Sequence, residues 1–257
     1  MSKNPGFSQG IELSALKKPS GGALDLMRPG DGTPWEDRGH LGAVKAYLNT
    51  ALRSITSPAL LMDHIRRPET TADSTVFAII SCAMWAVGVL IYNAYFLYVA
   101  FPKLVHAGLY DADINAGFFW LTALLQAAMV GGGVFLWMKV GTSMFMNLAA
   151  QELKSVPHSL IYNCFAYATG PSLLAVVPVI GWPIAFALIV LDQIACGKRR
   201  LFMKGASAVI NPLIIAFCVL AIAAVAYYVL GWLWCTHLEM NGLTAIAPKP
   251  AAPVLAH

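Results

Sequence analysis

Long apolar stretches alternate with short polar connections along most of the chain. Five of them stand out, at residues 76–101, 117–139, 161–180, 184–196 and 209–234. A helix needs about 20 apolar residues to cross a hydrocarbon core of ~30 Å, so all but the fourth stretch have the length of a membrane span. The pattern predicts an all-α fold, an integral membrane bundle of five transmembrane helices over residues 76–235, preceded by an N-terminal amphipathic interfacial helix.

Repeated breaks mark the third stretch, where residues 165–182 read FAYATGPSLLAVVPVIGW. Proline and glycine interrupt a helix, and in a membrane the freed backbone carbonyls are tolerated only where neighbouring helices cover them. We therefore expect residues 161–180 and 184–196 to form a hairpin at the centre of the bundle. The run Gly131–Gly133 in the second stretch lets another helix approach closely, and the broken stretch is the expected neighbour.

The segments outside the bundle differ in composition. Residues 1–40 are rich in Gly, Pro, Ser and charge, so we expect a flexible tail, and residues 236–257 form a second, short tail. Residues 41–75 carry an apolar stripe at helical spacing, made of Leu41, Val44, Leu48, Leu52 and Ile55. Two placements stay open for this amphipathic region: on the membrane surface with basic side chains toward headgroups, or docked on the chain's own bundle.

Charge supports the membrane assignment and suggests an orientation. Only 12% of the 257 residues are charged and 58% are hydrophobic, against about 25% charged in an average soluble domain. From the N-terminus, the tails and connections carry 9, 1, 2, 0, 4 and 1 Lys or Arg residues. Because Lys and Arg concentrate on the cytoplasmic side, this alternation predicts a cytoplasmic N-terminus and an external C-terminus.

One carboxylate, Asp192, lies within the apolar stretches. It precedes a basic cluster by six residues, and the members of that cluster are Lys198, Arg199 and Arg200. We expect Asp192 to pair with this cluster at headgroup level, and all four residues to contact lipid or a partner protein. The alternative is a proton or ion pathway, because ionisable groups inside a membrane are costly and often functional.

Signatures of catalysis are not found in the sequence. Ser172 stands in a GPS sequence, which is not the nucleophile elbow G-x-S-x-G, and the histidines fall in tails, connections or segment ends. No Walker, Rossmann or EF-hand motif occurs, and no CxxC pair. We therefore predict that the protein is not an enzyme and has no catalytic residues, cofactor or metal. Because the basic residues flank membrane segments, we predict no nucleic-acid binding.

The broken stretch resembles a known family. The pattern consists of Tyr167, Ala168, Pro171, Leu173, Leu174, Pro178, Ile180 and Gly181. It is similar to that of the Yip (Ypt-interacting protein) domain family of multi-pass membrane proteins. The resemblance implies a five-helix domain in which Tyr167, Pro171, Leu174, Pro178 and Gly181 are structural. Eukaryotic members bind Rab-type GTPases and carry an acidic Pro-Leu-Leu-Glu-Glu-Leu-Gly motif that is absent here, so the chain looks more like the bacterial, inner-membrane branch.

Three functional hypotheses follow. The first is a non-catalytic scaffold or accessory subunit that binds membrane lipids and other integral membrane proteins within a larger complex. The second is a small transporter or channel that uses the broken third and fourth helices. The third is a trafficking-type adaptor that binds a GTPase through its N-terminal arm, as the eukaryotic relatives imply.

Overall fold

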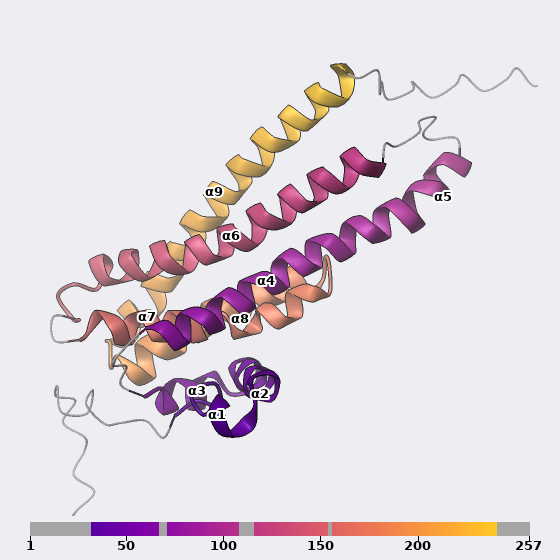
Figure 1. Ribbon diagram of the computed structural model, residues 1–257. Coiled ribbons are helices and arrows are strands. Elements are labelled where there is room, and N and C mark those ends of the chain that lie inside the picture. Colours follow the sequence, from indigo (N-terminus) through magenta and orange to yellow (C-terminus); the bar gives the residue numbers. More distant parts are fainter. Residues whose placement is uncertain (1–31, 67–70, 108–115, 154–155, 241–257) are drawn as a thin grey trace, which may run out of the picture.

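The computed structural model describes residues 32–66, 71–107, 116–153 and 156–240, and every regular element among them is a helix (Figure 1). The predicted all-α fold is therefore confirmed for this part of the chain. Residues 1–31 of the predicted N-terminal tail and residues 241–257 of the predicted C-terminal tail lie outside the described residues.

Among the described residues, four helical segments are long and apolar enough to cross a membrane, which confirms the membrane-protein prediction at this coarser level. Helix α4 (Ala72–Tyr95) continues through a π-helical turn, Phe96–Ala100, into α5 (Phe101–His106). The other three are α6 (Ala116–Leu148), α8 (Gly181–Ala195) with its π-helical extension Cys196–Arg200, and α9 (Gly205–Met240).

The third predicted span, residues 161–180, is not a continuous helix. Residues 161–180 fall in α7 (His158–Tyr167) and in the 3-10 helix η4 (Gly170–Val176), so the helix breaks where the sequence has its first Gly-Pro pair. A turn over residues 177–180 then leads into α8, and η4 packs directly against α8. Val179 in this turn has φ +69°, a conformation that β-branched residues rarely adopt.

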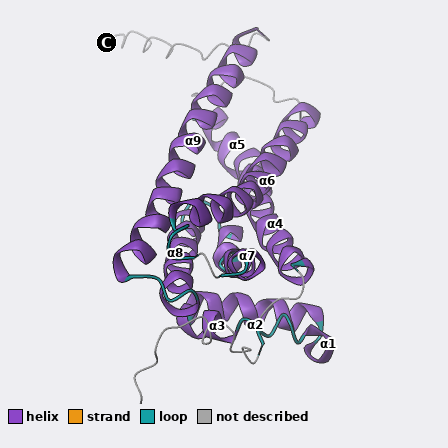
Figure 2. Cartoon of the chain, turned by 90° about the vertical axis from the view of Figure 1, so that its left-hand side faces the viewer, coloured by secondary structure: helices purple, strands orange, loops and turns teal. Residues whose placement is uncertain are grey.

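The N-terminal arm consists of α1 (Arg38–Leu41), α2 (Ala43–Thr56) and α3 (Pro58–His64), which lie crosswise at one end of the bundle (Figure 2). The buried face of α2 consists of Ala46, Tyr47, Thr50, Ala51 and Ser54. The aliphatic stripe with Val44, Leu48 and Leu52 is exposed. Of the two placements left open by the sequence, docking on the chain's own bundle is the one found, through a face made of Tyr47 and four small residues.

The arm begins before residue 40, where the sequence places the end of the flexible tail. Trp35 is only 2% exposed, with Tyr47 and Phe77 packed around its indole ring. Its Nε1 donates a hydrogen bond to the Asp73 carbonyl oxygen at 2.8 Å, and its backbone N–H donates to Thr50 Oγ1 at 2.9 Å. Residues 32–40 therefore belong to the packed structure, because one large aromatic side chain supplies the burial that their composition lacks.

Helix α6 packs against α4, not mainly against the broken stretch as the sequence suggests. A Cβ at Gly131 would lie 3.2 Å from the Cys82 carbonyl oxygen, so this glycine is where the two backbones approach closely. A Cβ at Gly132 or Gly133 would meet no atom within 4 Å. Toward the end of the bundle distal to the arm, α9 diverges from α4 and α6 (Figures 1 and 2).

Candidate functional site

The helix break lies against α4 at a glycine. A Cβ at Gly88 would lie 2.0 Å from the Ala175 carbonyl oxygen, so only a hydrogen allows this approach. The indole Nε1 of Trp182, from α8, donates to the same carbonyl oxygen at 3.0 Å. Helix α4 therefore covers this carbonyl group of the break, and α8 supplies its hydrogen bond, as a break in a membrane helix requires.

A second tryptophan contacts the break from α4. Trp85 Nε1 donates to Ser172 Oγ at 2.9 Å, and both side chains are buried. The GPS serine is thus an acceptor in a helix-to-helix hydrogen bond. Thr169 uses its hydroxyl locally, donating to the Ala166 carbonyl oxygen at 2.6 Å. Both hydroxyl groups of the break therefore take part in hydrogen bonds within the protein.

The five motif residues of the sequence surround this break. Tyr167 is the last residue of α7 and is fully buried, and Pro171 is buried in the first turn of η4. The Leu174 carbonyl oxygen would lie 2.0 Å from a Cβ at Gly181, so a second close approach closes the hairpin. Pro178 is half-buried in the turn, where its carbonyl oxygen accepts a hydrogen bond from the Ile180 backbone N–H at 2.8 Å.

Asp192 is fully buried beneath the break. Its Oδ2 accepts a short hydrogen bond from the Ser54 hydroxyl of α2. Gly170 makes room for that serine, because a Cβ at position 170 would lie 2.7 Å from the Ser54 Cβ. Oδ1 of Asp192 and Oε1 of Gln193 are buried without a hydrogen-bond partner among the described residues.

The predicted ion pair between Asp192 and the basic cluster is wrong. The carboxyl group bonds to α2, whereas Lys198 and Arg199 are exposed on the π-helical extension of α8. Arg200 is buried and donates from Nη2 to the Ile65 carbonyl oxygen at 2.9 Å. Proximity in sequence did not bring the charges together, because α2 and α3 cover this end of α8. Of the four predicted contact residues, Lys198 and Arg199 are thus the two at the surface.

Tyr167 also connects the break to the arm. Its hydroxyl donates to Glu36 Oε1 at 3.3 Å, and Glu36 Oε2 accepts from the Thr33 backbone N–H at 2.7 Å. Burial raises the pKa of Glu36 above its ordinary value of 4.5, and these hydrogen bonds oppose the rise. Two salt bridges at the rim join Arg38 to Asp73 and Arg66 to Asp37, at 2.6 and 2.9 Å.

Several residues of this site were missed by the sequence analysis. They are Trp35, Glu36, Ser54, Trp85, Gly88 and Trp182. The one available signal was the lone tryptophan in the Gly/Pro-rich stretch DGTPWED. Glu36 is the next residue of that same stretch and lies in the turn before α1. The other four sit in ordinary positions of helices, and their roles depend on which neighbour they meet.

Comparisons of the chain with protein-family models, with curated proteins and with solved structures find no match. The resemblance to the Yip family stays a prediction based on the motif residues. In the part of the chain that the structure describes, no cluster of three or more His, Cys, Asp and Glu side chains is placed to hold a metal. The arrangement that the residues do form is a junction that joins arm, break, α4 and α8.

Proposed function

We propose that the protein is a non-catalytic scaffold or accessory subunit of a membrane protein complex. The observation that carries the proposal is the contrast between the two ends of the bundle. On the arm side of the bundle, polar side chains hydrogen-bond to one another and tie arm, break, α4 and α8 together. Toward the distal end, α6 and α9 diverge, and along both helices apolar side chains are left uncovered by the described chain, among them Leu121, Leu125, Phe217 and Ile222.

Other integral membrane proteins and lipid would cover this distal surface. Helices associate in a membrane through van der Waals packing, so an apolar face without charge suits either neighbour. At the opposite end, the exposed Lys198 and Arg199 suit anionic headgroups or an acidic partner surface. The amphipathic arm, with Leu48 and Leu52 exposed beside Lys45 and Arg53, suits the membrane interface.

The proposed orientation has the arm in the cytoplasm and the C-terminus outside, in the inner membrane of a bacterial cell. The charge alternation along the sequence supports it. In this topology the α7–η4 segment is the third of five crossings, and the hairpin turn lies toward the external face. Single cysteines introduced at positions 45 and 257 would test this by labelling intact cells from the outside. The cysteine at position 257 should be labelled and the one at position 45 should not.

A native gel of tagged protein from its own membranes tests the scaffold role directly. Wild-type protein in mild detergent should migrate in a complex larger than the 27.6 kDa chain with its detergent. Leu125→Trp and Ile222→Trp place bulk at positions that are 61% and 69% exposed, so they should release the chain from the complex without unfolding it. Val87→Trp, on an exposed position of α4, is the matched control and should stay in the complex. Wild-type migration as a single chain would contradict the proposal.

A second candidate is a transporter or channel, and Asp192 favours it. This carboxyl group is buried within a candidate span, and its Oδ1 has no hydrogen-bond partner among the described residues. Ionisable groups at such depth often mark ion or proton pathways. Purified protein in proteoliposomes would then carry a proton or cation flux that Asp192→Asn abolishes. Equal flux in empty vesicles, wild-type vesicles and variant vesicles would eliminate this candidate.

A further inference from the structure

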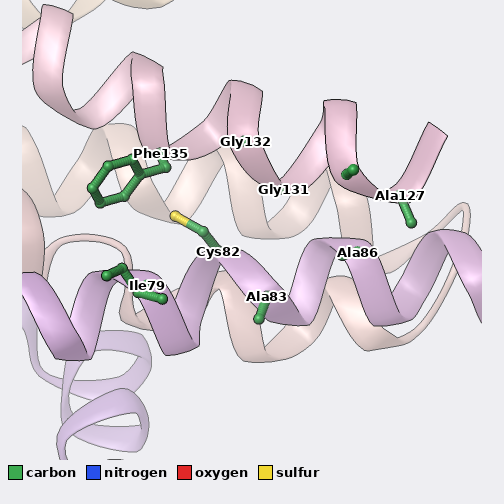
Figure 3. A pocket seen from close by; sticks show the side chains of 9 residues that line it. Ile79, Cys82, Ala83, Ala86, Ala127, Gly131, Gly132 and Phe135 are labelled. Carbon is green, nitrogen blue, oxygen red and sulfur yellow. The ribbon is translucent and has the colours of Figure 1, made fainter. Parts of the chain in front are cut away.

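An apolar groove runs along the outside of the bundle between α4 and α6 (Figure 3). Its floor is buried and consists of Cys82, Ala127 and Gly131. Gly132 and Ile79 form its exposed rims, and Figure 3 shows the groove between the two helices. The volume is about 330 Å³, and the residues from Ala127 to Phe135 extend it over about 12 Å of helix. Because both walls are candidate membrane spans, the groove opens toward the hydrocarbon core.

A single cation stands in line with this groove. Lys139 follows Phe135 by one helical turn on α6, and its side chain is exposed. Its Nζ lies 5.8 Å from the ring centroid of Phe135, which lines the groove, and 4.6 Å from the ring centroid of Tyr162 on α7. The two aromatic rings thus hold the ammonium group at the arm end of the groove.

The ammonium group is available to an external anion. No ion pair to Lys139 occurs among the described residues, and it is the only charged side chain of α6. The arm end of the bundle carries most of the basic residues, so Lys139 lies toward the headgroup region of that leaflet. A cation at the headgroup level of an apolar groove complements a lipid phosphate with an acyl chain below it.

We propose that this groove binds one acyl chain of an anionic phospholipid, with the lipid phosphate at Lys139. The charge in line with the groove selects such a lipid over a partner helix, because a helix packing on small residues would need no anion there. The proposal holds for the isolated protein and does not depend on a complex.

Native mass spectrometry of the delipidated full-length protein tests the proposal, with phosphatidylglycerol and phosphatidylcholine of identical chains as probes. Wild-type protein should retain phosphatidylglycerol in preference to phosphatidylcholine. Lys139→Gln should remove about a fivefold preference for the anionic lipid, as expected for one basic side chain near the surface. Unchanged preference in Lys139→Gln would overturn the assignment of the phosphate site.

Two neighbouring glycines supply a matched pair for the chain-binding part. Gly132 lines the groove and Gly133 does not, while a Cβ at either position would meet no atom within 4 Å. Gly132→Leu should fill the groove and lower retention of both lipids, whereas Gly133→Leu should bind as the wild type does. Ala128→Leu, also in the groove, repeats the test if Gly132→Leu lowers the unfolding temperature. Equal retention in all three variants, or a change in oligomeric mass without a change in lipid adducts, would overturn the proposal.

Discussion

Replacing Gly88 by alanine would test the packing at the helix break. The added Cβ would lie 2.0 Å from the Ala175 carbonyl oxygen and 3.1 Å from Trp182 Nε1. Ordinary van der Waals contacts begin near 3.4 Å. The backbone of η4 would therefore have to move by more than an ångström, although Trp182 and the Trp85–Ser172 bond hold it in place.

The size of the effect follows from two opposing terms. Overpacking a well-packed interior costs about 1–3 kcal/mol, and a clash with backbone belongs at the upper end of that range. Alanine in place of glycine within a helix returns about 0.5–1 kcal/mol. The net loss is about 2 kcal/mol, which for a chain of this size corresponds to a fall in unfolding temperature of about 4–8 °C.

Thermal unfolding in detergent, with Gly132→Ala as control, measures the difference. A Cβ at Gly132 meets no atom within 4 Å, so only the propensity gain remains and the unfolding temperature should rise by about 1–4 °C. The same substitution should thus act with opposite sign in neighbouring helices. If Gly88→Ala raised the unfolding temperature as Gly132→Ala does, the break would not pack on α4 at this residue.

Three further predictions concern the arm. Trp35→Ala should cost about 3–5 kcal/mol of arm docking, seen as about 10²- to 10⁴-fold faster amide exchange in residues 38–41, and unchanged exchange would refute the anchor role. Because burial raises the pKa of Glu36, its protonated form favours docking, so docking should weaken as pH rises from 4.5 through the raised pKa. Exchange rates corrected for intrinsic pH dependence should show this, and Glu36→Gln should flatten the profile. Ser54→Ala should lower the free energy of unfolding by about 1–3 kcal/mol in the wild-type protein, but by little in a protein that already carries Asp192→Ala. Additive losses in the double variant would show that the two side chains are not coupled.

The membrane helices could be predicted from the sequence because hydropathy reports burial in lipid or protein directly. Four of the five predicted stretches occur in helices that are long and apolar enough to cross a membrane. Their ends differ by several residues, as for α4, which begins at Ala72 where the prediction places Val76. Polar residues at a helix start or end are compatible with the helix and do not mark its boundary.

The inward face of α2 could not be predicted from the same pattern. The periodic aliphatic residues Val44, Leu48 and Leu52 point away from the bundle, and apart from Tyr47 the buried face consists of small residues. Close approach of helices uses small side chains, and the spacing of large apolar residues along the sequence does not reveal them. The buried face is recognisable only once Gly170 is known to lie against Ser54.

The misplaced ion pair has the same origin. Six residues separate Asp192 from the basic cluster, and the sequence alone gives no reason to prefer a neutral hydroxyl 138 residues away. The break supplies that reason, because η4 begins with Gly170 and so leaves space for Ser54 to reach Asp192 from α2. Break, arm and carboxyl group therefore depend on one another. Gly170 opens the 3-10 helix that interrupts the third stretch, and it also makes room for Ser54 of the arm. The interruption of the third stretch and the docking of α2 therefore belong to one packing arrangement.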